Sequence, residues 1–154
     1  MRVKTLQYPE QKEDIIKRCQ VCNVAMADEN QNPYVLPFNF AYADGVLYLH
    51  SAPEGRKIDI LTQNPRVCIS FSTDYELYHQ NENVACSYSM RYRSVLVYGE
   101  VEFVGQLDEK KRILNKIMAH YTGKGEFSYN LPALTNVKIF KVNISQMDGR
   151  TFGY

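Results

Sequence analysis

Large and small side chains alternate with a period of two along much of this chain, which is the pattern of β-strands. The clearest case is residues 34–42, where aromatic and leucine side chains occupy the even positions. Because proline cannot donate to a ladder, Pro37 predicts that this strand lies at a sheet edge or contains a bulge. The Asp44-Gly45 pair then predicts a tight turn into a second strand at residues 46–50.

Further strands are predicted at residues 21–27, 66–73, 91–104 and 137–144. Gly99 lies within the longest of them, which is typical of a sharp bend at a barrel corner. In the last strand the apolar phase changes between Ile139 and Phe140, which predicts a bulge there. Residues 74–89 and 122–134 lack a regular pattern and are predicted to be loops.

Two helices are predicted from their charges and apolar stripes. Residues 9–19 begin with acidic and end with basic side chains, as the helix dipole favours, and Ile15 and Ile16 would supply the buried stripe. Residues 107–121 carry apolar side chains at helical spacing, and Asp108 is predicted to cap this helix.

A shorter helix is predicted between strands, because Ser51 and Glu54 match a capping box and the helix would end near Gln63. Short helices inserted among hairpin-connected strands do not match a doubly wound α/β sheet. The order of elements predicts a mainly β fold, an antiparallel β-barrel with peripheral helices. A length of 154 residues suits one domain, so residues 1–154 are expected to form a single domain.

Charge and composition narrow the function. The chain has 18 Lys and Arg against 17 Asp and Glu residues, for a formal charge of +1. Without an overall basic field, a dedicated DNA-binding protein is not expected. There is no apolar run of transmembrane length, and the N-terminus lacks the apolar core of a signal peptide. A cytoplasmic location is expected, with neither nucleic acid nor membrane as a partner.

The four cysteines are expected to be free thiols, since the cytoplasm is reducing. Cys19 and Cys22 have the spacing of a metal or redox pair, but a zinc site would need a second close pair, and Cys68 and Cys86 stand apart. A thioredoxin-like pair would begin a helix, whereas this one falls at a helix-to-strand junction. The other interpretation makes Cys22 and Cys68 buried strand residues, and no metal site is expected.

The strongest local signal for chemistry is residues 50–57, with the sequence HSAPEGRK. Free N–H groups at a helix N-terminus attract anions, and Arg56 and Lys57 add a planar fork and a point charge. This segment could hold one phosphate group, or it could be a solvated helix start with two surface cations. His50 could bond a ligand or act as an acid or base near neutral pH, or it could be a rim histidine.

A second candidate segment opens the longest predicted strand. Arg91 and Arg93 lie there among several hydroxyl side chains between residues 87 and 94. They could bind an acidic or polar ligand, or simply face water. The chain contains no Walker-type loop, dinucleotide fingerprint, HExxH sequence or nucleophile elbow.

Longer runs of the chain are more specific than these local signals. The longest is PYVLPFNFAYADGVLYLHSAPEGRKID at residues 33–59, followed by NPRVC at 64–68. The series continues with ACSYSMRYRSV at 85–95, LDEKK at 107–111 and MDGR at 147–150. In this order, the runs resemble the pyridoxamine 5'-phosphate oxidase-like flavoproteins, and more narrowly their nitroimidazole-resistance branch. The resemblance covers nearly the whole chain after the first helix.

The resemblance implies a split β-barrel that forms a homodimer and binds FMN at the subunit interface. It implies a set of cofactor-binding positions, namely Phe38, Asn39, His50, Ser51, Arg56, Lys57, Arg93 and Ser94. Residues 56–57 match the basic pair that holds the FMN phosphate, and residues 50–51 match strand-end positions beside the flavin. Residues 38–39 match the segment along the isoalloxazine edge, and residues 93–94 match a strand start that also borders the cofactor.

The resemblance also implies an FMN-dependent oxidoreductase that reduces a small electrophile such as a nitro compound, with His50 as the candidate catalytic residue. The chain ends soon after Met147, without the extension in which true pyridoxamine phosphate oxidases carry substrate-binding residues, so vitamin B6 oxidation is not expected. Two alternatives stay open: a non-catalytic flavin-binding or sensing protein, and a binder of haem or a deazaflavin in the same cleft. The basic pair 56–57 suits a terminal phosphate, which favours FMN over haem.

Overall fold

The structure is a computed structural model that describes residues 1–154, and its framework is one antiparallel sheet. The strands are β1 (Val3–Leu6), β2 (Cys22–Ala27), β3 (Pro33–Phe38), β4 (Phe40–Ala43), β5 (Val46–Ser51), β6 (Arg66–His79), β7 (Tyr88–Val104) and β8 (Lys138–Phe152). The helices are α1 (Pro9–Arg18), α2 (Arg56–Gln63), α3 (Leu107–Thr122) and α4 (Leu131–Asn136), with one 3₁₀ turn, η1 (Ala85–Ser87).

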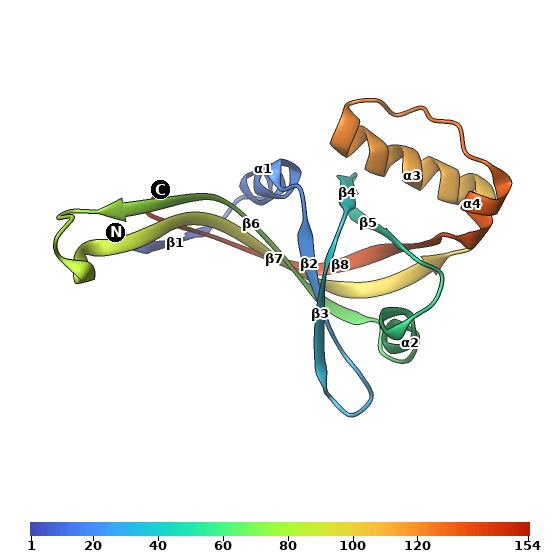
Figure 1. The fold of residues 1–154 in the computed structure, drawn as a ribbon, viewed down its shortest axis with the longest axis horizontal. Coiled ribbons are helices and arrows are strands. Elements are labelled where there is room, and N and C mark those ends of the chain that lie inside the picture. Colours follow the sequence, from blue (N-terminus) through green and yellow to red (C-terminus); the bar gives the residue numbers. More distant parts are fainter.

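The sheet curls into a split barrel. Its strand order is β3-β2-β6-β7-β8-β5-β4, with β1 added beside β8. β3 and β4 lie at opposite ends of this order but follow each other in the chain, separated only by Asn39 (Figure 1). This confirms the predicted mainly β, antiparallel barrel with peripheral helices. Pro37 lies on the edge strand β3, as its missing N–H predicts.

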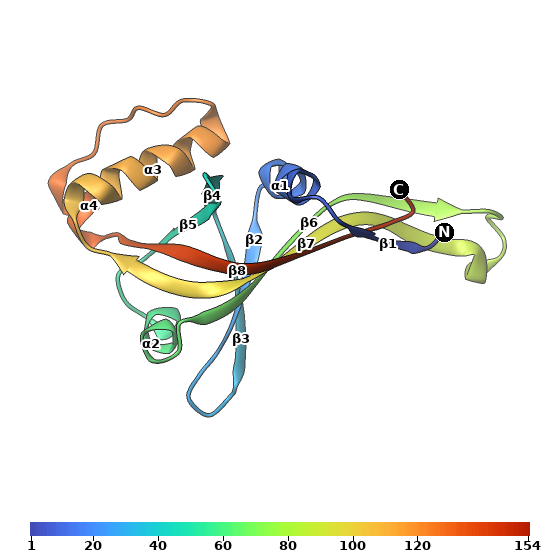
Figure 2. The ribbon, with the colours of Figure 1, turned by 180° about the vertical axis from the view of Figure 1, so that it is seen from behind.

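The interior of the barrel holds the main hydrophobic core. Twenty buried residues form this cluster, from α1 and the residue after it, from α2 and from seven strands. Ile15 and Ile16 of α1 are part of it, as predicted. A second cluster lies outside the barrel, where Ile113 and Ile117 of α3 pack on β4, β5 and β8. Seen from behind, α3 lies over β4 and β5, and α1 lies near β2 (Figure 2).

β8 takes part in both cores, which corrects one prediction. Ile139 packs in the outer cluster and Phe140 in the barrel interior, so adjacent residues are both fully buried. The predicted bulge between them is therefore wrong. The real bulge is at Ser145, opposite the step from Tyr98 to Gly99. A Cβ added to Gly99 would lie 2.3 Å from the Asn143 carbonyl oxygen, so this close approach requires glycine.

Several predicted boundaries were wrong. α2 begins at Arg56 and not at the predicted capping box. Ser51 is the last residue of β5, where it pairs with Lys138 of β8, and its hydroxyl donates to the Ala52 carbonyl. α3 begins at Leu107 without a side-chain cap, so Asp108 lies in its first turn. The predicted loop 122–134 contains the start of α4. β1 was not predicted, and β8 extends beyond residue 144 to pair with it.

No helix has the length and apolar character needed to cross a membrane.

The largest departure from the prediction is residues 74–89, which form a hairpin rather than a loop. β6 continues to His79 and β7 starts at Tyr88, and the two pair throughout after a register shift between Thr73 and Glu76. We call residues 74–79 and 88–93 the β arm, which projects away from α2, α3 and α4 (Figure 1). No residue of the arm is fully buried, so the sequence there lacks the alternation of core and surface positions that marks a strand.

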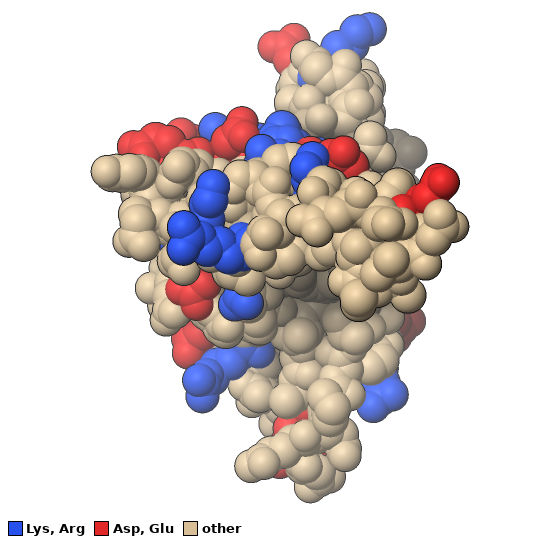
Figure 3. Space-filling model, turned by 90° about the vertical axis from the view of Figure 1, so that its left-hand side faces the viewer, with Lys and Arg blue, Asp and Glu red and all other residues tan.

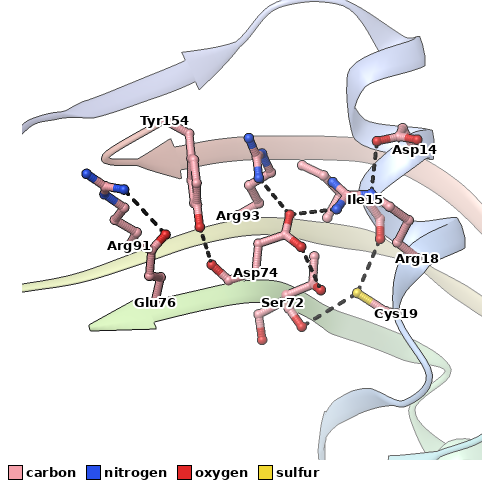
Figure 4. A network of polar contacts seen from close by, with 11 residues as sticks. Asp14, Ile15, Arg18, Cys19, Ser72, Asp74, Glu76, Arg91, Arg93 and Tyr154 are labelled. Atoms are coloured by element: carbon pink, nitrogen blue, oxygen red, sulfur yellow. Dashed lines mark hydrogen bonds and ion pairs between the residues drawn. The ribbon is translucent and has the colours of Figure 1, made fainter. Parts of the chain in front are cut away.

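Asp74 anchors the base of the β arm. It has a positive φ of 57° at the register shift, and its carboxylate accepts bonds from Arg18 Nη1 at 2.6 Å and Arg93 Nη1 at 2.7 Å (Figure 4). The Tyr154 hydroxyl donates to the Asp74 carbonyl at 2.8 Å, and its ring lies 3.7 Å from the Arg93 guanidinium carbon. These contacts join α1, β6, β7 and the C-terminal segment.

Candidate functional site

A cavity of about 440 Å³ lies where β3 and β5 end and α2 begins. Among the residues that line it are five from the predicted set, namely Phe38, Asn39, His50, Ser51 and Lys57. The volume is within the range of small-molecule pockets in proteins. The structure therefore brings together side chains that the sequence places in three separate short segments.

β3 and β5 position four of these residues, at the points where the two strands end. Asn39 separates β3 from β4, and this break leaves Asn39 exposed while Phe38 stays buried. The Phe38 ring packs edge-on against Phe140, 5.8 Å between centroids, which fixes its place in the cavity wall. β5 ends with His50 and Ser51, whose partners on β8 are Ile139 and Lys138.

The chemistry of His50 follows from its burial. Desolvation lowers the pKa of His50 below the ordinary value of a histidine, and no charged or hydrogen-bonding neighbour contributes to this shift. The imidazole is therefore neutral at pH 7, with one nitrogen as a donor and the other as an acceptor. A neutral imidazole facing a cavity can form a hydrogen bond with a ligand either as the donor or as the acceptor.

The start of α2 presents two cations that are not held in ion pairs. The residue before it, Gly55, has a φ of 126°, and no side chain caps the helix, so the first N–H groups are open to a ligand. Lys57 is half-buried in the cavity wall, and the Arg56 guanidinium carbon lies 4.3 Å from the centre of the Tyr34 ring. Neither cation takes part in any ion pair. This corner suits an anion such as a phosphate group.

The structure does not bring Arg93 and Ser94 to this cavity within one chain. Arg93 lines a different cavity of about 410 Å³, at the base of the β arm, where it is bonded to Asp74. Ser94 lies on β7 between Ser72 of β6 and Arg150 of β8. The eight predicted positions therefore divide into six at the start of α2 and the nearby strand ends, and two on β7.

Part of the cavity wall was not predicted from the sequence. Val21, Leu36, Pro37 and Ala52 also line it. Leu36 and Pro37 directly precede a predicted position and could have been included for that reason. Val21 carried no local signal, because it reaches the cavity only through the pairing of Cys22 with Phe38.

The cysteines lie apart from this cavity. All four are free thiols, and Cys22 is fully buried on β2, where burial raises the pKa of its thiol to about 12 and keeps it unreactive. Cys68 is half-buried on the outer face of β6, where it lines a shallow concavity of about 900 Å³ together with Tyr98. No group of three or more His, Cys, Asp or Glu side chains is placed to hold a metal ion.

The fold and the cavity together define a split-barrel protein with a candidate small-molecule site. The model of the pyridoxamine 5'-phosphate oxidase family matches residues 9–151, and the chain belongs to this family. No curated protein matches the chain.

Solved structures support the same assignment. The chain is similar to a candidate 5-nitroimidazole antibiotic resistance protein from Bacteroides thetaiotaomicron, with 44% identity, a TM-score of 0.88, and coverage of 98% of this chain and 88% of that one. It is also similar to an FAD-binding protein from Mesorhizobium loti, with 26% identity, a TM-score of 0.71, and coverage of 99% and 100%. The FAD and heme binding protein from Mycobacterium smegmatis shares the fold, with 16% identity, a TM-score of 0.84, and coverage of 98% and 74%.

Proposed function

We propose that this chain is an FMN-dependent oxidoreductase that binds its flavin in the cavity beside α2. The observation that carries the proposal is the convergence of Phe38, Asn39, His50, Ser51 and Lys57 on one cavity next to an uncapped helix start. FMN has a flat apolar ring system and a terminal phosphate. The cavity lining offers both kinds of contact, since it contains the apolar side chains of Leu36 and Phe38 and the cation Lys57.

In this proposal each group has a distinct task. Lys57, Arg56 and the first N–H groups of α2 hold the phosphate through charge-assisted hydrogen bonds, because neither cation is already held in an ion pair. Phe38 and Asn39 border the ring system. His50, neutral because of its burial, forms a hydrogen bond beside the ring and can pass a proton to a substrate there.

The reaction class is the reduction of a small electrophile, and a nitro compound is the proposed substrate. Bound FMN would supply the transfer of an electron pair, taken from a reduced nicotinamide. The first electron pair, with two protons, converts the nitro group to a nitroso group and releases one oxygen as water. The support for this substrate is the 44% identity to the candidate nitroimidazole-resistance protein. Oxidoreductase activity, as opposed to flavin binding alone, is tested by nicotinamide oxidation that depends on a nitroaromatic acceptor.

The visible absorption spectrum of the purified protein, followed by release of the chromophore, tests the proposal. A two-band flavin spectrum with FMN released is the expected result. A flavin spectrum without nitroaromatic turnover would instead favour a flavin-binding or sensing protein. Released haem or deazaflavin, or a colourless protein that takes up no added FMN, would contradict the FMN assignment.

We also propose that two copies form a homodimer through the outer face of β7. Val95 and Val97 point into the barrel and are fully buried, so the alternate residues from Tyr88 to Tyr98 lie on the opposite face. This outer row consists of Tyr88, Met90, Tyr92, Ser94, Leu96 and Tyr98. At about 3.3 Å per residue the row is about 33 Å long, and it includes the exposed large hydrophobic side chains Tyr88 and Met90. Exposed apolar patches are typical of protein–protein interfaces.

Several features favour a second copy of the chain as the partner. No side chain in the row is charged, and the row ends in the shallow concavity beside Tyr98 and Cys68. Viewed from the end of the β arm, basic and acidic groups are interspersed with wide areas that carry neither (Figure 3). Ser94, a predicted flavin contact that is absent from the cavity of its own chain, lies in the middle of the row. A partner's copy of this row would supply the missing part of the flavin site.

Leu96→Glu tests the homodimer, because it puts a charge in the middle of the row. We expect the dimer dissociation constant to rise about a hundredfold or more, since the interface would have to bury two unpaired carboxylates. The matched control is Leu131→Glu on α4, where the side chain is 62% exposed. Light scattering gives the mass of each variant. A monomeric wild-type mass with FMN bound would contradict the interface model.

A further inference from the structure

The break between β3 and β4 leaves one backbone group without its ladder partner, and a side chain from a distant helix supplies that partner. Phe40 follows the break and is fully buried, so its N–H group needs an acceptor. The Tyr121 hydroxyl, at the C-terminal end of α3, accepts this N–H at 3.1 Å. The bond spans 81 residues of sequence and holds the chain directly beside Asn39, which lines the cavity.

The same hydroxyl also holds the neighbouring segment of the cavity wall, because Val21 precedes Cys22, which pairs with Phe38 beside Asn39. Tyr121 Oη donates to the Gln20 carbonyl oxygen at 2.6 Å, and the next residue, Val21, lines the cavity. The Tyr121 hydroxyl therefore accepts a hydrogen bond from the Phe40 N–H group, after Asn39, and donates one to the Gln20 carbonyl, before Val21. Because both bonds share one oxygen atom, the two segments cannot move apart without losing at least one of them.

The residue beside Tyr121 strengthens this connection. His120 Nε2 lies 2.9 Å from the Cys19 carbonyl oxygen, and its ring packs on Phe40 with 4.6 Å between centroids. The last turn of α3 thus contacts two successive carbonyl groups between α1 and β2, and the first residue of β4. No other helix joins these two segments by side-chain hydrogen bonds.

We infer that Tyr121 is a positioning residue for the proposed flavin cavity: beyond the last pair of the β2–β3 ladder, its hydroxyl sets the distance between the segments that carry Val21 and Asn39. The inference rests on the proposed function for the identity of the ligand. Tyr121 does not line the cavity, so its effect on the ligand passes through the backbone at Gln20 and Phe40.

Tyr121→Phe removes the shared hydroxyl and keeps the ring. We expect the FMN dissociation constant to rise about tenfold, because two backbone groups lose their partner and the cavity walls separate. We also expect a shift in the visible absorption of bound FMN, which a change in overall stability alone would not cause. The affinity is measured by flavin fluorescence, in buffer where urea titration shows the variant to be folded.

Tyr129→Phe is the matched control. Its hydroxyl bonds only to Asn115 Oδ1, at 3.0 Å, in the segment after α3 and away from the cavity. This variant should bind FMN like the wild type, with an unchanged spectrum. Equal FMN affinity and equal spectra for Tyr121→Phe and the wild type would overturn the inference.

A second readout separates this inference from the proposed function. Hydrogen exchange of the Phe40 amide needs no ligand, and we expect it to be faster in Tyr121→Phe than in the wild type and in Tyr129→Phe. If the wild type binds no FMN but this acceleration is found, the FMN proposal fails and Tyr121 still sets the cavity walls. If the Phe40 amide exchanges equally in all three proteins, Tyr121 does not hold this wall and the inference fails.

Discussion

The protein has basic side chains in two cavities, and the two cavities differ in what those cations already contact. At the base of the β arm, Arg93 is bonded to Asp74 and stacked on Tyr154. At the start of α2, Arg56 and Lys57 have no carboxylate partner. The Arg93 charge is balanced within the protein by Asp74, whereas Arg56 and Lys57 are left to attract a negative charge from a ligand or from solvent.

This difference separates a structural cation from a binding cation. An arginine paired with an internal carboxylate stabilises the fold, and a ligand phosphate would have to displace that partner. A cation at an open helix start gains from a bound phosphate without losing an internal bond. The sequence presents both sets simply as basic residues near strand or helix ends, so only the contacts distinguish them.

Replacement of both open cations is the strongest way to test the comparison. In Arg56→Ala with Lys57→Ala, we expect FMN affinity to fall about a hundredfold while the fold is kept, since two charge-assisted bonds to the phosphate are lost. Flavin fluorescence titration measures the affinity, and circular dichroism checks the fold.

The control for this double variant removes two positive charges elsewhere. Lys17 on α1 and Lys124 after α3 are both exposed, and Lys17→Ala with Lys124→Ala should bind FMN nearly as well as the wild type. If the folded Arg56 and Lys57 double variant kept its full flavin affinity, the phosphate assignment would be wrong.

Loss of the Asp74 charge at the base of the β arm should lower the stability of the fold rather than the affinity for flavin. Burial alone would raise the pKa of Asp74, but the hydrogen bonds and charges of Arg18 and Arg93 outweigh burial and hold it below the ordinary value. Asp74→Asn keeps a side chain that tolerates the positive φ and removes the charge. We expect the free energy of unfolding in urea to fall by about 1–2 kcal/mol at pH 7.

Low pH should remove the stabilisation by the ionised Asp74 carboxylate from the wild-type protein. The folded-state pKa of Asp74 is lowered, so its stabilisation is complete above about pH 4 and is lost as the pH falls through the folded value. Glu76→Gln is the control on the same arm, because its single ion pair with Arg91 is more exposed. Equal unfolding free energies for Asp74→Asn and Glu76→Gln would remove the distinction between an anchoring pair and a surface pair.

The local part of the site could be predicted because its residues are close in sequence. The Asp44-Gly45 turn sets the register of the β4–β5 hairpin and pairs Phe40 with Leu49. Residues 38–39 and 50–51 must then lie near each other, whatever the rest of the fold does. The start of α2 follows directly after β5, so its cations reach the same place.

The remainder depends on contacts between distant segments. Tyr121 is indistinguishable in sequence from other tyrosines on helix faces, and its bonds span 81 and 101 residues. The β arm was predicted as a loop because neither of its faces is buried in a core. For α4 a usable signal existed, since Asn130 caps it through a 2.8 Å bond from the Ala133 N–H group.

The smallest expected effect concerns His50, in the open cavity. Because burial lowers the pKa of His50 in the folded protein, the unfolded chain binds a proton at higher pH than the folded one does. The free energy of unfolding should therefore fall as the pH drops below about 6.5, in a range where Asp74 stays ionised. His50→Gln should flatten this dependence between pH 5 and about 7, whereas His79→Gln, at the exposed end of the β arm, should leave it unchanged. Identical pH profiles for the two variants would show that His50 is not held neutral by its surroundings. It would then have no advantage over a surface histidine as the group that hydrogen-bonds a ligand in the cavity.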